Sequence, residues 1–337
     1  MIEIKHLQKK YGGHVAVDDL NLTIEPGRIY GFLGPNGAGK STTMNIITGY
    51  LGATQGTVEV DGFDIFEKPE EAKRRIGYLP ETPPLYMDMT VEEYLDFAAE
   101  LKGVDRDVLE AHVDEVMERT RTWDVRERLI RNLSKGYRQR VGLAQAILGY
   151  PAIIILDEPT IGLDPAQIIE MRTLIRELGQ SHTVILSSHI LSEVRETCDY
   201  IFIIAGGRLV ASDTTENLIA GAGSGRQELK LLVRGDGQDA AAALASIREV
   251  DTASVATAPG AEPETTSVTF RTKDDVDARQ PILAKLVRRK CEVLEFASTG
   301  KSLEDIFMDL VASGEAPEDV PEQAEEDVPE QTEEVDA

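Results

Sequence analysis

The sequence predicts an α/β fold, in which helices pack on a parallel sheet and a smaller α+β unit follows. The apolar run Ile153 to Leu156 is typical of a strand that is buried on both faces, as in parallel sheets, and a second apolar run, Ile29 to Leu33, indicates another strand. Helical patterns such as Thr90 to Lys102 lie between these runs. From Leu229 onward the predicted elements follow the order β-α-β-β-α-β, which indicates the second unit.

Length and composition limit the possible functions. The chain has 337 residues, enough for two domains, and 42% of them are hydrophobic. Its formal net charge of −25 argues against a nucleic-acid partner, because such binding depends on Lys and Arg contacts to phosphates. No apolar run approaches the ~20 residues of a membrane span, and the N-terminus lacks a signal pattern. With Cys198 and Cys291 as ordinary reduced thiols, we expect a cytoplasmic location.

A glycine-rich loop follows the first apolar run and precedes a helical pattern from Thr43 to Leu51. The loop consists of Gly34, Pro35, Asn36, Gly37, Ala38, Gly39, Lys40, Ser41 and Thr42. Its glycines let backbone N–H groups curve around phosphate oxygens, and a helix N-terminus adds partial positive charge. Lys40 would reach the β- and γ-phosphates, and the Ser41 hydroxyl would bind Mg²⁺. A turn with an incidental lysine would lack these flanking elements, so the loop predicts a P-loop NTPase core.

The first part of the chain reads as antiparallel strands. Short apolar runs alternate with turn residues over residues 1 to 27, and Thr57 to Val60 is predicted to join the same sheet. Tyr11 is the notable aromatic residue of this part. It is either a ring that stacks on a purine or an ordinary sheet aromatic. The residues alone leave both readings open.

The middle of the chain reads as helical. Thr90 to Lys102 begins with a capping box, and Asp105 to Thr122 is predicted as a second helix. Three prolines between Ile76 and Met89 exclude a helix there and favour a docking loop. A third helix is expected to run from Leu133 to Tyr150. Ser134 at its start is either a plain N-cap or part of an anion-binding helix N-terminus.

Acidic and imidazole side chains follow two predicted strands. Asp157 and Glu158 end the run that starts at Ile153, where α/β sheets carry their chemistry. Asp157 would hold Mg²⁺ through water, and Glu158 would orient or deprotonate the attacking water. His189 follows the strand Thr183 to Ser187 and is either a polar strand end or a donor to the γ-phosphate. The remaining histidines show no ligand spacing, and we assign them no role.

The α+β unit is predicted as a ferredoxin-like module over residues 227–311. Its expected strands are Leu229 to Val233, Ala253 to Ala256, Ser267 to Phe270 and Glu292 to Phe296, and its expected helices are Asp239 to Ile247 and Asp277 to Lys290. A glycine-rich linker, Gly221 to Gly225, separates it from the domain of residues 1–220. Leu303 to Val311 is expected to be a closing helix. Residues 312–337 are acidic and repetitive, which predicts a disordered tail.

The motifs occur together and in an order that resembles the ATP-binding subunit of ABC transporters across residues 1–220. They are the glycine-rich loop, Leu133 to Gln139, Asp157 with Glu158, Gly162-Leu163-Asp164 and His189. The resemblance implies a RecA-like parallel sheet with an antiparallel β subdomain and a helical subdomain. It implies that Tyr11 stacks on adenine, that Ser134 and Gly136 close over the nucleotide of the opposite subunit, and that Asp164 communicates across a homodimer.

Two departures from the family pattern narrow the resemblance. Glu81 stands where glutamine is usual and would join the Mg²⁺ shell, and the signature helix begins Leu133-Ser134-Lys135-Gly136-Tyr137. These variants resemble an exporter branch of gliding-motility and sodium or drug export ATPases. We therefore expect an ATPase that binds ATP and Mg²⁺ and works with separate membrane permease subunits at the inner face of the membrane. The alternatives are a soluble factor of translation or DNA repair, and a non-catalytic nucleotide-gated regulatory subunit.

Overall fold

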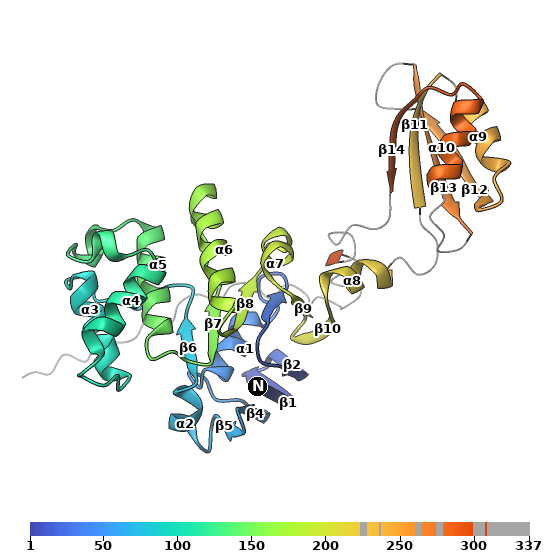
Figure 1. Cartoon of the computed structure of the whole chain (residues 1–337). Helices are drawn as coiled ribbons and strands as arrows, with labels where there is room; N and C mark the ends of the chain where they lie inside the picture. Colours follow the sequence, from blue (N-terminus) through green and yellow to red (C-terminus); the bar gives the residue numbers. More distant parts are fainter. Residues whose placement is uncertain (223–227, 236, 260–263, 274–278, 299–306, 309–337) are drawn as a thin grey trace, which may run out of the picture.

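A computed structural model describes residues 1–222, 228–235, 237–259, 264–273, 279–298 and 307–308. The expected tail of residues 312–337 lies outside this part, as does most of the expected closing helix, of which Phe307 and Met308 are helical. Three sheets organise the described chain (Figure 1). None of the helices in these ranges combines the length and the apolar character that a membrane span requires.

The central sheet has six strands in the order β10-β9-β3-β8-β7-β6. They are β3 (Ile29–Leu33), β6 (Ile76–Leu79), β7 (Ile153–Asp157), β8 (Thr183–Ser188), β9 (Tyr200–Ala205) and β10 (Arg208–Asp213). All neighbours pair in parallel except β10, which is antiparallel to β9. Every residue of β3, β7 and β8 is buried, as their apolar runs predict.

Both faces of the central sheet carry a hydrophobic core. On β7, Ile154 and Leu156 belong to the core beneath the helices, and Ile153 and Ile155 belong to the core against the second sheet. This alternation follows from the two-residue period of a strand. It explains why the run before Asp157 has no polar residue.

The second sheet is antiparallel and has the order β2-β1-β4-β5. Its strands are β1 (Ile2–Tyr11), β2 (His14–Ile24), β4 (Gln55–Val60) and β5 (Phe63–Asp64). The sheet expected from residues 1 to 27 and from Thr57 to Val60 is therefore confirmed. It places the β1–β2 turn near the glycine-rich loop, since Ala16 on β2 lies against Gly39.

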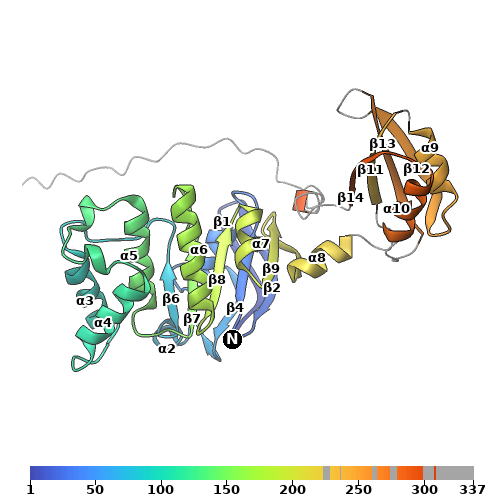
Figure 2. The same ribbon diagram turned by 45° about the horizontal axis from the view of Figure 1, so that its top comes forward.

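Helices surround the central sheet (Figure 2). They are α1 (Lys40–Ile47), α2 (Pro69–Lys73), α3 (Val91–Leu101), α4 (Leu109–Arg119), α5 (Lys135–Ile147), α6 (Pro165–Gly179), α7 (Leu191–Thr197) and α8 (Thr215–Ala222), with 3₁₀ turns η1 (Trp123–Val125) and η2 (Ile130–Asn132). Helices α3, α4 and α5 pack on one another and form the helical unit beside β6.

Several helix limits differ from the expected ones. Helix α1 starts at Lys40, earlier than expected. Helices α1 and α5 end early, at Ile47 and Ile147, because Gly49 and Gly149 turn the chain with positive φ. Helix α4 begins only at Leu109, because the Asp105 carboxylate accepts from the Asp107 N–H at 3.1 Å and holds a turn. The first two residues of the expected linker, Gly221 and Ala222, belong to α8. The other three, residues 223–225, lie outside the described part.

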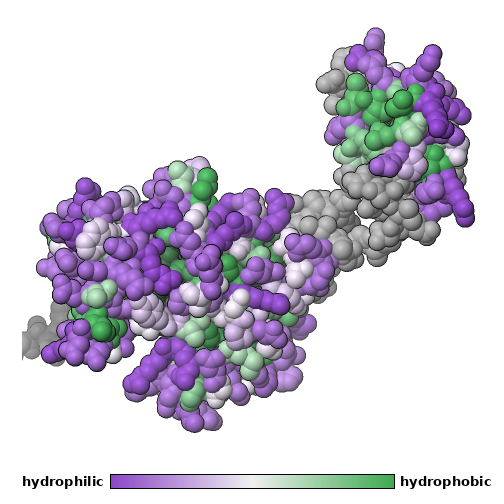
Figure 3. Space-filling view, in the orientation of Figure 1, coloured by the Kyte–Doolittle hydropathy of each residue, from purple (hydrophilic) through white to green (hydrophobic). Residues whose placement is uncertain are grey.

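The third sheet is antiparallel, with the order β12-β13-β11-β14. Its elements are β11 (Glu228–Arg234), α9 (Gln238–Ala245), β12 (Val250–Pro259), β13 (Thr265–Thr272), α10 (Arg279–Arg288) and β14 (Val293–Ser298), in the expected sequence. It has a hydrophobic core of its own, which includes Leu231 and Phe270. Figure 3 shows a hydrophobic patch on this unit, whose exposed apolar residues include Leu283, Val287 and Leu294.

Candidate functional site

The glycine-rich loop leads directly into α1. Gly37 has φ +77° and Gly39, the N-cap of α1, has φ +98°. A Cβ on Gly39 would collide with the Ala16 carbonyl oxygen, so the position requires glycine for both its dihedral and its space. The first-turn N–H groups of a helix have no partner within the helix. The loop and the helix start therefore offer a cradle for an anion.

Lys40 supplies a fixed cation at this cradle. Its ammonium donates to the Gly34 carbonyl at 2.8 Å and to the Pro35 carbonyl at 3.1 Å, and lies 3.7 Å from Glu158 Oε1. The side chain is only 5% exposed, and this burial lowers the pKa of Lys40, against the opposing effect of the Glu158 and Asp157 carboxylates. A phosphate would give this ammonium a better partner than a carbonyl, because charge-assisted bonds are stronger.

Asp157 and Ser41 approach each other across the sheet and α1. Ser41 Oγ donates to Asp157 Oδ1 at 3.1 Å, and Ser187 Oγ donates to the same oxygen from the end of β8. Both residues bring hard oxygen atoms to one point. Oxygen donors of this kind fit Mg²⁺, which binds proteins through few groups and completes its shell with water and phosphate.

Glu158 and His189 form the second pair at the strand ends. His189 Nδ1 lies 2.9 Å from Glu158 Oε2, and the Glu158 N–H donates to Ser187 Oγ at 3.0 Å. Glu158 is 7% exposed and adopts φ +47°, a left-handed conformation that is uncommon outside glycine. Strained backbone of this kind clusters at functional sites. The Glu158 carboxylate lies near both Lys40 and His189.

A pocket of about 420 Å³ gathers most of the predicted residues. They are Tyr11, Asn36, Gly37, Gly39, Lys40, Ser41, Thr42, Glu81, Glu158 and His189. Gly34, Pro35 and Ala38 form the loop behind it, with Gly34 and Pro35 holding Lys40 through their carbonyls. Tyr11 is 48% exposed, and the Lys9 ammonium lies 5.1 Å from the centroid of its ring.

The same pocket includes residues that the sequence reasoning missed. His14, Ala16 and Ile161 line it, and His14 pairs with Tyr11 across the β1–β2 turn. The signal for His14 was present in the sequence. Gly12-Gly13 between two strand patterns predicts a two-residue hairpin, which sets its neighbours opposite each other.

Three further predicted residues lie neither in the glycine-rich loop nor at this pocket, and Asp157 lines only the neighbouring groove. Ser134 is the N-cap of α5 and accepts from the Tyr137 N–H at 3.3 Å. Asp164 is the N-cap of α6 and accepts from the Gln167 N–H at 2.9 Å. Gly136 lies between the two helix starts, since a Cβ there would press on the Gln167 side chain at 2.7 Å. Ser134 and Asp164 are exposed at these helix starts, and Gly136 is buried beneath Gln167.

The two unusual signature residues have definite places. The Tyr137 hydroxyl donates to Asp124 Oδ2 at 2.8 Å, and the Arg140 guanidinium lies 5.4 Å from the Tyr137 ring centroid. Tyr137 therefore joins α5 to the η1 turn. The end of the Lys135 side chain lies over Gly162, where a Cβ would collide with its ammonium.

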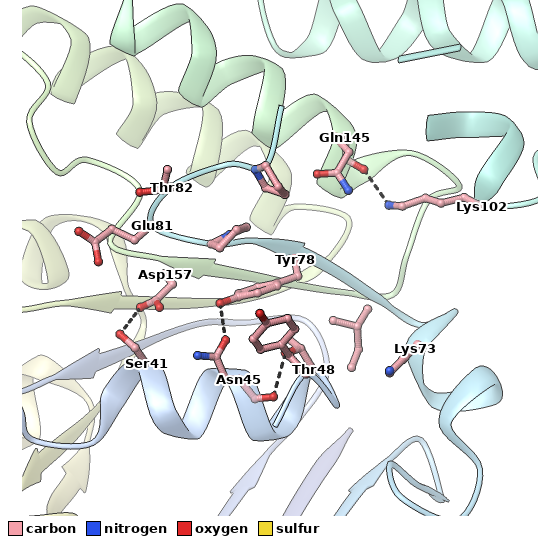
Figure 4. A pocket seen from close by; sticks show the side chains of 14 residues that line it. Ser41, Asn45, Thr48, Lys73, Tyr78, Glu81, Thr82, Lys102, Gln145 and Asp157 are labelled. Atoms are coloured by element: carbon pink, nitrogen blue, oxygen red, sulfur yellow. Dashed lines mark hydrogen bonds between the residues drawn. The ribbon is translucent and has the colours of Figure 1, made fainter. Parts of the chain in front are cut away.

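A groove of about 680 Å³ lies beside the nucleotide-sized pocket (Figure 4). Ser41, Asp157 and Glu81 line it next to the pocket. On its wall the Tyr78 hydroxyl donates to Asn45 Oδ1 at 3.0 Å. At its far side Lys102 donates to carbonyls in the last turn of α5, such as that of Gln145 at 2.7 Å. Glu81 lines both cavities, so this groove and the pocket share a wall.

The described residues hold no cluster of three or more His, Cys, Asp or Glu side chains that could bind a metal ion by itself. A divalent cation at Ser41 and Asp157 therefore needs further oxygen ligands from a nucleotide and water.

Comparison with known proteins identifies related chains. The sequence profile of the family described as ABC transporter matches residues 17–161. The chain is 41% identical over 212 residues to the bacitracin transport ATP-binding protein of Bacillus licheniformis, covering 62% of this chain and 68% of that protein. It is 34% identical to the Nod factor export ATP-binding protein I of Cupriavidus pinatubonensis, covering 65% of this chain and 68% of that protein.

A solved structure shares the fold. It is the dimeric, post-hydrolysis state of an ATP-binding cassette bound to ADP and Pi. The TM-score is 0.58 at 25% identity, and the match covers 64% of this chain and 98% of that chain.

Proposed function

Because the chain belongs to the family of ABC transporter ATP-binding proteins, we propose that it hydrolyses ATP at the 420 Å³ pocket to drive export through separate membrane subunits. The observation that carries this proposal is the group of Lys40, Glu158 and His189 beside the N-terminus of α1, in which Lys40 and Glu158 are buried and His189 is exposed. It combines a fixed cation, a carboxylate and an imidazole at one phosphate cradle. Phosphoryl transfer depends mainly on such positioning and charge stabilisation.

Each residue has a chemical role in this proposal. The loop N–H groups and Lys40 bind the β- and γ-phosphates, and Tyr11 stacks on the adenine ring. Glu158 accepts the proton of the attacking water, and His189 donates a hydrogen bond to the γ-phosphate. The contact between His189 and Glu158, at 2.9 Å, holds both at the same end of the pocket.

Mg²⁺ fits the oxygen atoms that the chain offers. Ser41 and Asp157, 3.1 Å apart, would hold the ion, with Glu81 at the edge of its shell. When bound, the ion would neutralise charge on the transferred phosphoryl group. The hydroxyl of Ser41 and the carboxylate of Asp157 are already oriented toward each other, and Ser187 holds Asp157 from behind.

We further propose a head-to-tail homodimer. Ser134, Gly136 and Asp164 lie outside the pocket of their own chain, on the face formed by the starts of α5 and α6. In a head-to-tail pair this face would close on the nucleotide of the second copy. The related ATP-binding cassette solved as a dimer supports this arrangement. Nucleotide with a divalent cation would then join two acidic chains that otherwise repel each other.

The 680 Å³ groove is the proposed contact with the membrane subunits. It is lined by Glu81 and Thr82 of the proline-ordered loop after β6, and Tyr50 at its rim is exposed. Since Glu81 also lines the nucleotide pocket, binding or loss of the phosphates would shift a residue that also lines the groove. The chain would then lie at the cytoplasmic face of the membrane. Export is proposed from the resemblance to the exporter branch and to the Nod factor export relative.

We also propose three parts for the chain, with bounds 1–220, 227–311 and 312–337. The separate hydrophobic core of the third sheet supports the first division, while Phe307, within 227–311, packs against a core of the first part. The second part is proposed as a ferredoxin-like module, since its order β-α-β-β-α-β and its strand order β12-β13-β11-β14 fit that fold.

The experiment is a phosphate-release assay on Glu158→Gln. A general base typically contributes about 10²- to 10⁴-fold, so we expect a turnover loss of that size with ATP binding retained. Turnover-dead protein should also collect as a dimer with Mg-ATP in size-exclusion chromatography. The matched control is Glu177→Gln, an exposed residue paired with Arg121, which should hydrolyse like the wild type.

Lys40→Ala separates binding from turnover. Hydrogen bonds to charged groups contribute about 1.5–3 kcal/mol, so ATP should bind roughly ten- to hundredfold more weakly. Normal turnover in Glu158→Gln, or a Glu158→Gln variant that stays monomeric with Mg-ATP, contradicts the proposed mechanism.

A further inference from the structure

A buried carboxylate outside the nucleotide pocket links two turns, one that contains His189 and one that follows Glu158. Glu193 lies in α7 and is only 3% exposed. Its Oε2 accepts from Thr160 Oγ1 at 2.7 Å and from Ser188 Oγ at 3.0 Å. Thr160 and Ser188 are buried as well. Burying a carboxylate is costly unless hydrogen bonds compensate, so these two bonds hold the three side chains firmly together.

The two hydroxyl groups belong to different loops. Ser188 is the last residue of β8 and directly precedes His189. Its hydroxyl oxygen also accepts from the Ile190 N–H at 3.0 Å, which fixes the turn on the other side of His189. Through Ser188, the Glu193 carboxylate therefore fixes the backbone of the His189 turn.

Thr160 belongs to the turn that follows Glu158. Its carbonyl accepts from the Leu163 N–H at 3.2 Å, and this turn ends at Asp164, the N-cap of α6. One residue earlier on β8, Ser187 bonds to both Asp157 and the Glu158 N–H. Adjacent serines thus make two connections between the ends of β7 and β8, one direct and one through Glu193.

We propose that Glu193 is a positioning residue for ATP hydrolysis. Through its hydrogen bonds with Ser188 and Thr160, it fixes the position of the His189 turn relative to the turn from Glu158 to Asp164. This inference rests on the proposed function, because it concerns the step that Glu158 and His189 carry out. Glu193 does not line the nucleotide pocket. Its loss should therefore lower the rate of hydrolysis without weakening nucleotide binding.

The test measures kcat and the Kd for ATP in five variants, one of them a double variant. Displacement of a reacting group by ~1 Å can cost about 10²-fold, and we expect a loss of at least about tenfold in kcat for Glu193→Ala. Its Kd for ATP should stay within about twofold of wild type, because the phosphate cradle is untouched. Glu193→Gln retains an acceptor oxygen and similar volume, and should recover most of the rate.

Thr160→Val provides the coupling test. Glu193→Ala should cost much less in a Thr160→Val background than in the wild type, since the shared hydrogen bond is already absent. The control is Glu196→Gln on the same helix, an exposed residue paired with Arg172, which should leave kcat unchanged. Thermal unfolding of each variant checks that a lower rate does not reflect loss of folded protein.

The possible failures are distinct. Unchanged kcat in Glu193→Ala, additive effects with Thr160→Val, or a loss of ATP affinity as large as the loss of rate would each overturn the role of Glu193. Each of these leaves the proposed function intact where Glu158→Gln still stops turnover. A wild-type chain without any Glu158-dependent hydrolysis overturns both.

Discussion

At the scale of single residues, Lys40 and Glu158 show how the site is prepared for charge. The Lys40 ammonium is held by the Gly34 and Pro35 carbonyls, and Glu158 is held in a left-handed backbone conformation. Both side chains are therefore fixed before they meet a phosphate. Fixed groups need little reorganisation during the reaction, which is the main source of electrostatic catalysis.

Buried histidines make the folded chain sensitive to acid. His112 on α4 is buried, its Nε2 accepts from the Gly149 N–H at 2.9 Å, and its ring meets Tyr150 edge-on. Burial lowers the pKa of His112, with Lys102 acting in the same direction and Glu115 against it. Below about pH 6.5, the pKa of a histidine in the unfolded chain, His112 binds a proton in the unfolded chain more readily than in the folded chain. The free energy of unfolding should therefore fall as the pH falls below that value.

His112→Gln tests this expectation. Glutamine keeps an acceptor for the Gly149 N–H but does not titrate, so the variant should lose less stability than the wild type between about pH 7.5 and pH 5.5. The difference is at most about 1.4 kcal/mol per pH unit for one group. Urea unfolding at the two pH values measures it. Equal losses in both proteins would show that His112 does not titrate as described.

Residue identity could be predicted from the sequence where spacing carries the chemistry. The glycine-rich loop, Asp157, Glu158 and His189 were found because each follows an apolar run, and the pocket gathers the loop with Glu158 and His189. The left-handed φ of Glu158 and the contacts of Glu193 could not be found in this way. They depend on strands that are distant in the sequence, such as β7 and β8, becoming neighbours.

At the scale of elements, local signals decided where helices begin, and glycines decided where they end. Thr90 starts α3 with a complete capping box, as its sequence predicts. The Glu93 N–H donates to Thr90 Oγ1 at 3.2 Å, and the Thr90 N–H donates to Glu93 Oε2 at 2.8 Å. Helices α1 and α5 end earlier than their apolar patterns predict, because Gly49 and Gly149 turn the chain with positive φ.

Thr90→Ala should weaken the helical unit. It removes an acceptor for a first-turn N–H group, and such N-cap changes cost about 1 kcal/mol of unfolding free energy. Chemical denaturation measures the loss at a constant denaturant slope. Thr173→Ala on α6 is the matched control, since its exposed hydroxyl bonds only to the Ile169 carbonyl in its own helix. A loss in Thr90→Ala no larger than in Thr173→Ala would remove the cap as a source of stability.

At the scale of the whole molecule, two of the three sheets share a hydrophobic core and the third has its own. The central and second sheets are joined through one core, to which β3, β7 and β8 all contribute. The third sheet encloses its own core, with Leu231, Leu244, Val268 and Phe270 among its members. Phe307 packs beside the core under the helices, so the chain contacts the first part again after the third sheet. That return could not be predicted, since Leu303 to Val311 shows only an amphipathic pattern.

Separate cores predict two unfolding transitions. The proposed nucleotide pocket lies in the first part, and a ligand at 100 times its Kd stabilises the unit that binds it by about 2.7 kcal/mol. Scanning calorimetry with Mg-ATP and Glu158→Gln, which avoids turnover, should therefore raise one transition and leave the other in place. Phe270→Ala, which opens a cavity in the third sheet's core, should lower the ATP-insensitive transition instead, by about 3–5 kcal/mol in unfolding free energy. One transition that moves as a whole under both changes would mean that the two cores unfold together.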